Sequence, residues 1–240
     1  MPIDWNARAC RWFEAASAYT GYHQKLTEIL KRYIPCGESL CDLGCGAGLI
    51  DLALAEHCSA VTGIDRAPGA IAYLQASAAR RSITNLRALC MDAAAFLTPH
   101  DTVTAFFLGE RRFYERYFRL ARKRMIVAVH GRRTGTIGPE GYRTVQHTDA
   151  DEARACLDGL GVQYDYEAVR LEYGQPFSDL DDAREFVRAY ARPMGEDVLE
   201  RYLAEQLTGT GDPVWPYYLP KQKEIGLFII RREEAPVRSG

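Results

Sequence analysis

Residues 39–57 read SLCDLGCGAGLIDLALAEH, and this stretch decides the fold. It opens with a short apolar run, Leu40 to Leu43, and a glycine-rich turn follows. From Leu49 onward, leucines and alanines recur at helical spacing. The pattern predicts a strand, a tight glycine loop and a helix.

The same alternation continues along the chain. Further apolar runs predict strands, at residues 60–65, 86–91, 102–108, 125–130, 162–173 (with a bulge near Ala168) and 224–232. Helical periodicity predicts helices between them, at residues 67–82, 111–121 and 149–160. Strands that alternate with helices indicate βαβ units and a parallel sheet.

The two ends of this core carry additions. Residues 4–32 have apolar side chains at helical spacing, and residues 174–223 hold two more helical patterns and an aromatic, proline-rich segment. We therefore expect an α/β fold: a seven-stranded, mainly parallel, doubly wound sheet with an N-terminal helical extension and a helical cap before the last strand. The expected parts are residues 1–36, 37–173, 174–223 and 224–240, with a loop at 131–147 and a disordered tail at 233–240.

Composition narrows the class of protein. The net charge of the 240 residues is -2, which argues against a nucleic-acid-binding protein, since such proteins usually have a basic excess. The seven cysteines form no CxxC pair, so we expect free thiols and no metal site. The chain shows no signal peptide and no apolar run long enough to span a membrane, which predicts a cytoplasmic location.

The glycine loop indicates the kind of ligand. Glycines let a ligand approach the backbone closely, and a loop at the carboxyl edge of a parallel sheet forms the usual binding crevice. The loop reads GxGxG, whereas a dinucleotide-binding loop reads GxGxxG, which disfavours a nicotinamide oxidoreductase. Asp42 precedes the loop, where an acid suits a cationic amino-acid ligand better than a pyrophosphate.

Two more acids close strands. Asp65 ends the second strand, where a carboxylate can accept hydrogen bonds from both ribose hydroxyls of a nucleoside. Asp92 ends the third strand, where it can accept the exocyclic amine of adenine beside an apolar slot formed by Ala93, Ala94 and Phe96. The alternative for both acids is a helix cap, on residues 67–68 and 93–95 respectively.

These motifs resemble those of class I S-adenosylmethionine (SAM)-dependent methyltransferases. The resemblance lies in LCDLGCGAG, VTGID and CMDAAAF, within residues 39–108. It implies that the glycine loop holds the methionyl part of SAM, the second acid the ribose and the third acid the adenine. The cofactor-binding residues it implies are Asp42, Gly44, Cys45, Gly46, Gly48, Asp65, Arg66, Asp92, Ala93, Phe107 and, from the N-terminal helical region, Tyr19, for which ordinary packing is the alternative.

The acceptor side is less defined. Methyl transfer mainly needs alignment and exclusion of water, and an alcohol or phenol acceptor also benefits from a general base. Glu110 and His130, at the ends of adjacent strands, are candidates, although Glu110 can simply start a helix and His130 can be structural. Enzymes of this family that methylate the amino groups of bases carry a Pro-Pro-aromatic turn after the fourth strand, and this chain lacks it. Enzymes that methylate base carbon place a Pro-Cys pair there, whereas the pair in this chain, Pro35-Cys36, lies before the first strand.

Residues 111–133 are rich in arginine and lysine. They can form a solvated helix face or a binding site for an anionic acceptor. Aromatic residues of the expected cap can line an acceptor pocket or only pack it against the core: Tyr190, Trp215, Tyr217 and Tyr218. We expect an enzyme that transfers a methyl group from SAM to a small molecule, with anionic and aromatic compounds as the candidate acceptors. The alternatives are an aminopropyltransferase and a non-catalytic regulatory protein that binds SAM or S-adenosylhomocysteine (SAH).

Overall fold

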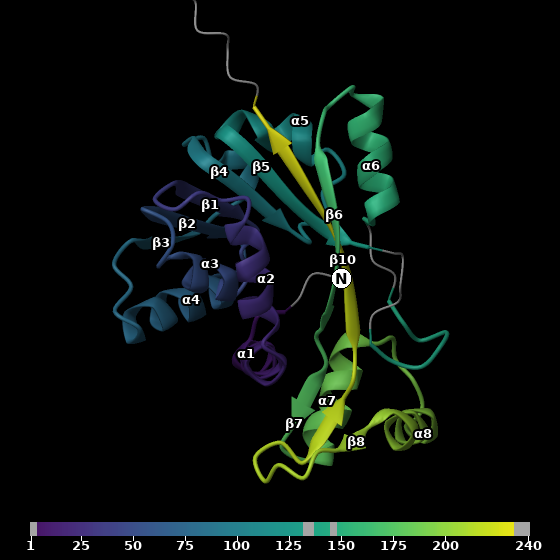
Figure 1. Ribbon diagram of the computed structural model, residues 1–240. Coiled ribbons are helices and arrows are strands. Elements are labelled where there is room, and N and C mark those ends of the chain that lie inside the picture. The colour runs from purple at the N-terminus through teal and green to yellow at the C-terminus, as the bar shows by residue number, and fades with distance from the viewer. Residues whose placement is uncertain (1–3, 132–136, 145–147, 233–240) are drawn as a thin grey trace, which may run out of the picture.

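A computed structural model describes residues 4–131, 137–144 and 148–232 of the chain. Within them, one sheet has seven strands in the order β3-β2-β1-β4-β5-β10-β6 (Figure 1). Its strands are β1 (Ser39–Leu43), β2 (Ala60–Asp65), β3 (Leu86–Cys90), β4 (His100–Phe106), β5 (Ala121–His130), β6 (Asp165–Glu172) and β10 (Gln222–Arg231). Strands β1 to β5 pair in parallel, and β10 lies antiparallel between β5 and β6. The predicted seven-stranded, mainly parallel sheet is confirmed.

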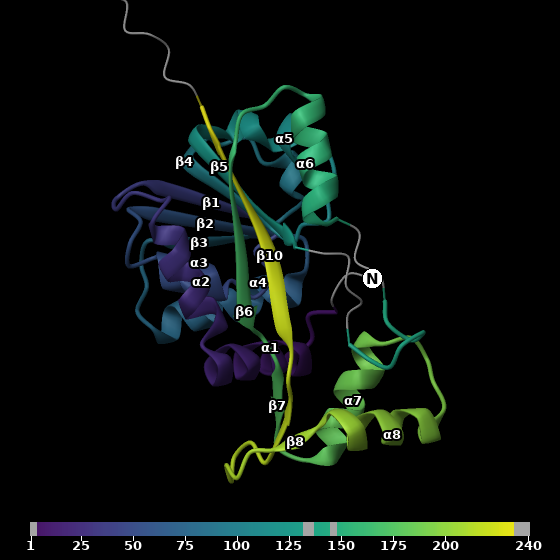
Figure 2. The same cartoon turned by 45° about the vertical axis from the view of Figure 1, so that its right-hand side comes forward.

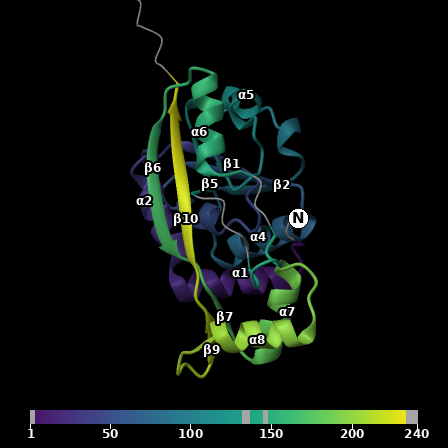
Figure 3. The same ribbon diagram turned by 90° about the vertical axis from the view of Figure 1, so that its right-hand side faces the viewer.

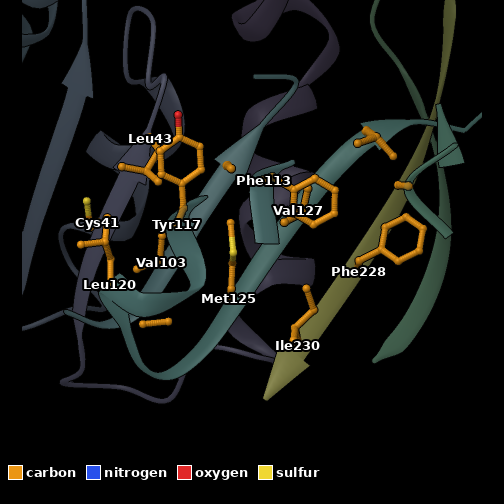
Figure 4. Packing of buried hydrophobic residues seen from close by; sticks show 14 of the residues in the cluster. Cys41, Leu43, Val103, Phe113, Tyr117, Leu120, Met125, Val127, Phe228 and Ile230 are labelled. Atoms are coloured by element: carbon orange, nitrogen blue, oxygen red, sulfur yellow. The ribbon is translucent and has the colours of Figure 1, made fainter. Parts of the chain in front are cut away.

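Two hydrophobic clusters cover the two faces of this sheet. One joins it to α5 (Phe113–Tyr117), the short helix η2 (Phe118–Leu120) and α6 (Ala150–Gly159), and Figure 4 shows its packing around Phe113 and Tyr117. The other joins it to α2 (Tyr22–Lys31) and α3 (Leu49–Leu54). Figure 3 shows α5 and α6 together on one side of the strands. Helices on both faces make the fold doubly wound, as expected.

The N-terminal extension is helical, as predicted. Helix α1 (Ala7–Thr20) begins at Asn6, whose side chain accepts a hydrogen bond from the N–H of Ala9. It ends at Gly21, which has a left-handed φ of 66° and lets the chain turn into α2. A further helix, α4 (Pro68–Arg80), has proline in its first turn and packs against β2 and β3.

The segment before the last strand forms a small separate layer. It contains β7 (Gln175–Phe177), α7 (Leu180–Tyr190), α8 (Glu196–Gln206), β8 (Thr208–Gly209) and β9 (Tyr217–Leu219). The three short strands, which the sequence did not predict, form a second sheet in the order β7-β9-β8. Figure 2 shows β10 running from this layer into the main sheet. Trp12 of α1 anchors the layer, since its ring meets that of Phe186 at 5.2 Å and its Nε1 donates to Asp182 at 2.8 Å.

Several element boundaries differ from the predictions. The bulge expected near Ala168 is absent, because β6 pairs with β10 without interruption and the small Ala168 lies on the exposed face. Strand β5 begins at Ala121 rather than residue 125, because Lys123 and Arg124 reach Glu38 with their charged ends. The predicted helix at 111–121 is reduced to α5 and η2. The tail expected at 233–240 lies outside the described residues.

Candidate functional site

The glycine loop after β1 has the geometry that its composition predicts. Gly44, Gly46 and Gly48 all adopt positive φ, at 77°, 55° and 66°. Gly48 also lies so close to Leu74 of α4 that an added Cβ would stand 2.5 Å from a leucine methyl carbon. Left-handed backbone and close approach both exclude larger residues, so the loop is a bare backbone bend at the carboxyl edge of the sheet.

Asp65 ties this bend to the end of β2. Its carboxylate accepts hydrogen bonds from the N–H of Gly46 at 2.9 Å and from the N–H of Ala67 at 2.8 Å. The second contact is the cap that the sequence offered as an alternative, so Asp65 does both tasks at once. Each carboxylate oxygen has two lone pairs, so Asp65 still has capacity to accept a ligand hydroxyl.

Asp42 lies beneath the loop and is buried, with 3% exposure. Thr104 of β4 donates a hydrogen bond to its carboxylate at 2.7 Å. Side chains alternate along β1, so Asp42 shares the face of Leu40 and points toward α3. There it meets Asp51, which is fully buried and whose two carboxylate oxygens have no hydrogen-bond partner at standard distances among the described residues.

Burial raises the pKa of both acids of this pair. For Asp51, desolvation is the larger cause, and the nearby charge of Asp42 adds to it. For Asp42, desolvation is again the larger cause, and the charge of Asp65 adds to it while Thr104 opposes it. Two close buried carboxyl groups cannot both ionise cheaply, so they hold at least one proton between them.

Asp92 is exposed and accepts a hydrogen bond at 2.8 Å from the N–H of Ala94, which caps the short helix η1 (Ala93–Ala95). The capping alternative is therefore present here too. Arg66 is exposed, and its carbonyl lies 3.8 Å from the Cys90 thiol. Cys45 points toward β2, where its sulfur limits the space at Gly63 to 3.1 Å for an added Cβ.

An aromatic side chain from the N-terminal segment does contact the loop, but it is Trp5 rather than Tyr19. The Trp5 ring packs so tightly on Gly46 that an added Cβ would stand 2.7 Å from it, and the Trp5 carbonyl packs on Gly69 of α4. Tyr19 is instead 39% exposed, and its ring packs on Tyr218 of β9 at 4.8 Å. A hollow of about 330 Å³ opens beside Trp5, between α1 and the start of α4.

The region that the sequence analysis considers for the acceptor lies at the ends of β4 and β5. Phe107 follows β4 with a positive φ of 54°, an uncommon conformation for a residue with a side chain. Its ring stacks near the His130 imidazole at 4.7 Å. The next residue, Leu108, packs over Gly44. The contacts therefore run without a gap from the glycine loop to Phe107 and His130.

The two predicted bases are poorly suited to accept a proton. Glu110 accepts from the N–H of Arg112 and from Arg116, and these contacts lower its pKa despite an opposing effect of burial. The cavity beside it measures about 10 Å³, room for one water at most. Burial, aided by the charges of Lys223 and Lys221, lowers the pKa of His130 to about 3, so its imidazole is neutral but weakly basic.

Lys223 is a residue of this region that the sequence did not single out. Its ammonium nitrogen lies 3.6 Å from the centre of the Phe107 ring, 5.1 Å from that of Tyr173 and 5.2 Å from that of Tyr22. Nothing in the local sequence marks it, because Tyr22 comes from α2 and Tyr173 follows β6. Only the fold brings these rings to one place.

Much of the basic stretch at 111–133 is neutralised within the described residues. Salt bridges join its arginines and Lys123 to nearby acids: Arg111 to Glu152, Arg112 to Glu115, Arg116 to Glu110, and Lys123 and Arg124 to Glu38. Arg132 and Arg133 lie outside the described residues. The stretch resembles a solvated, charge-paired face more than an anion site.

Comparison with known proteins identifies the family. Residues 40–123 match the methyltransferase domain family, across the glycine loop and the strands around it. These residues of the chain form a methyltransferase domain, and the sheet around them has the fold of the class I SAM-dependent methyltransferases. The predicted family is thus confirmed, and with it, at the level of the family, the enzyme class and the cofactor SAM.

Among the described residues, no three His, Cys, Asp or Glu side chains group as a metal site would require.

Solved structures with this fold agree. The YcgJ protein of Bacillus subtilis matches with a TM-score of 0.56 and 15% identity, over 88% of this chain and 100% of that one. The magnesium protoporphyrin IX methyltransferase of Synechocystis PCC 6803, solved with bound SAM, matches with a TM-score of 0.53 and 13% identity, over 94% and 84%. These likenesses show the shared fold.

A curated relative is similar over a shorter range. It is an uncharacterized RNA methyltransferase of Chlamydia trachomatis serovar D, 35% identical over 82 residues. The match covers 33% of this chain and 20% of the relative, so this methyltransferase spans only a small part of that protein's length. No helix among the described residues is long and apolar enough to cross a membrane.

Proposed function

We propose that this protein transfers a methyl group from SAM to a small-molecule acceptor and releases SAH. The observation that carries the proposal is the bare bend at Gly44–Gly48 between two acids. Asp42 lies beneath the bend and Asp65 beside it, so carboxyl oxygens are available to accept hydrogen bonds from the amino group and from the ribose of SAM.

The reaction is an in-line displacement at the methyl carbon of the sulfonium. The acceptor atom forms a bond to that carbon while the carbon–sulfur bond breaks and its electron pair stays on sulfur. The protein has to bind both partners, align them and exclude water. The loop and Asp65 hold the donor, and the Phe107–His130 face, joined to the loop through Leu108, is where the acceptor lies.

A small acceptor agrees with the surroundings of this face. Aromatic rings rather than unpaired arginines surround it, and the basic stretch that could follow a nucleic-acid backbone is largely paired with acids. The partial resemblance to an RNA methyltransferase makes RNA the acceptor to test against.

The test is a turnover assay with separate arms. The protein is incubated with SAM and with a panel of phenols, aromatic carboxylates and thiols, or with total RNA, and SAH is measured by mass spectrometry. We expect SAH only with small molecules, and loss of it in Asp65→Ala. Turnover with RNA alone would contradict the proposed acceptor class. SAM binding without SAH in any arm would favour a regulator, and methylthioadenosine formed from decarboxylated SAM would favour an aminopropyltransferase.

A further inference from the structure

Lys223 occupies a place where a charged lysine is hard to accommodate. It stands near the start of β10, which runs antiparallel to β5, so this start lies at the same edge as the end of β5. Ile225 pairs with His130 there. Lys223 therefore lies at the edge of the sheet where the parallel strands have their carboxyl ends, beside the end of β5.

The surroundings of the amino group are aromatic. The rings of Phe107, Tyr22 and Tyr173 enclose it, and those of Tyr22 and Tyr173 lie against each other at 4.2 Å. Within the described residues, no acidic side chain forms a salt bridge or hydrogen bond with Lys223. Lys223 is half-buried, and an ammonium among aromatic rings without an acidic partner carries a costly charge.

The other ionisable groups around it do not supply a counter-charge. Lys221, just before β10, is a like charge, and Arg143 acts on Lys221 in turn. His130 of β5 and His23 of α2 both have pKa values lowered to about 3 by burial, with the charge of Lys223 contributing. Burial raises the pKa of Tyr22 and Tyr173 far enough to keep both phenols neutral.

We propose that Lys223 is the general base of the methyl transfer, which it performs as an uncharged amine. The inference rests on the proposed function. As the acceptor's oxygen or nitrogen forms its bond to the methyl carbon, its proton moves to Nζ of Lys223, and the electron pair of the broken carbon–sulfur bond stays on SAH. The ammonium so formed is stabilised by the three aromatic faces until it releases the proton to water.

The acid–base properties of Lys223 suit this task. Burial, followed by the charge of Lys221, lowers the pKa of Lys223 to about 7. A general base works best when its pKa lies near the working pH. His130 is too weakly basic by comparison, and Glu110 is held by two arginine residues. The inference favours acceptors with a dissociable O–H or N–H, such as phenols, over thiols, which need little help from a base.

The test reads the amine directly and needs no acceptor. The chain has five lysines, so protein labelled with ¹³C at lysine Cε gives five signals, and Lys223→Arg assigns the one of interest. A pH titration should find Lys223 about half protonated near pH 7. A Lys223 that stays fully charged up to about pH 9, as an ordinary lysine does, would overturn the proposal.

A second titration locates the amine relative to the methyl group. SAM and SAH differ by one methyl group and one positive charge. If Lys223 lies beside the sulfonium, SAM should lower its pKa further than SAH does, by about half a unit or more, since a like charge disfavours the ammonium. Equal titration with both bound ligands would place Lys223 away from the reaction. Failure of either ligand to bind would count against the proposed function and leave the first titration valid.

Substitution then tests the chemistry with an acceptor from the panel. Lys223→Met should lower kcat about 10²- to 10⁴-fold with SAM affinity within twofold of wild type. Lys223→Arg keeps the charge but cannot act as a base, so it should not rescue kcat. In the wild type, kcat should fall below about pH 7 as Lys223 becomes protonated. The residual kcat of Lys223→Met should not show this fall, a difference that a merely structural lysine would not produce. Rescue by arginine would contradict the inference.

Discussion

The carboxylate of Asp65, at the end of β2, accepts a hydrogen bond at 2.9 Å from the N–H of Gly46, in the loop after β1. The acid assigned to ribose therefore also shapes the loop assigned to the methionyl group. Binding of the two parts of SAM should be coupled through this contact, because whatever moves Asp65 also moves the bend.

We expect Asp65→Ala to weaken SAM binding by about 1–3 kcal/mol, through loss of the ribose hydrogen bonds and of the tie to Gly46. Titration calorimetry measures this change. Asp65→Asn keeps one oxygen that can accept, and it should fall between wild type and alanine. An alanine variant with wild-type affinity would remove the ribose assignment.

The glycines of the bend should not tolerate alanine. Gly48→Ala combines a left-handed φ of 66° with a Cβ placed 2.5 Å from the fully buried Leu74, which has no room to move. We expect a loss of about 2–4 kcal/mol in the free energy of unfolding, measured in urea. Gly37→Ala is the matched control, since Gly37 has a φ of 82° but open space around it and should lose only about 1 kcal/mol. Equal losses would mean that the contact with Leu74 carries no energy.

The buried acid Asp51 should make stability fall as pH rises. Its pKa is raised in the folded state, so above about pH 4 the folded protein binds more protons than the unfolded chain. The free energy of unfolding then decreases with pH, by up to about 1.4 kcal/mol per pH unit for this group, until the folded pKa is reached. Asp51→Asn removes the ionisation, and its gain in stability over wild type should be larger at pH 8 than at pH 5. A gain independent of pH would contradict the raised pKa.

Trp5 should report on the donor site. Its ring rests on Gly46, and a hollow beside it offers space into which it can move when SAM enters. We expect SAM to change the intrinsic fluorescence of the wild type but not of Trp5→Phe, since the other two tryptophans, Trp12 and Trp215, lie in or beside the small layer before β10. If SAM changes the fluorescence of Trp5→Phe as much as that of the wild type, Trp5 does not respond to the ligand.

Local sequence was enough to predict the glycine loop and the strand and helix on either side of it. The strand, loop and helix at residues 39–57 are encoded by neighbouring residues, and the glycines of the loop indicate where the backbone adopts positive φ. The acids at the ends of β1 and β2 follow from strand position alone. The prediction of a bulge near Ala168 was wrong, because a small apolar residue is tolerated on an exposed strand face. The alternation of apolar and polar residues there therefore says little about the strand register.

The acceptor side could not be predicted in the same way. Lys223 matters because Tyr22, Phe107 and Tyr173 meet around it from three separate elements. The place of Glu110 after β4 predicts an available carboxylate, yet the N–H of Arg112 and the side chain of Arg116 donate hydrogen bonds to it. Which N-terminal aromatic reaches the loop also depends on how α1 packs on α4. Such contacts are set by tertiary structure, and no local pattern encodes them.

A crystal structure with SAH bound tests the central claim most directly. We predict electron density for the ligand at the carboxyl edge of β1, with its amino-acid end on the backbone of Gly44 to Gly48 and its ribose hydroxyls on Asp65. The sulfur should face Phe107 and Lys223. Density elsewhere on the protein, with this bend unoccupied at saturating SAH, would contradict the account.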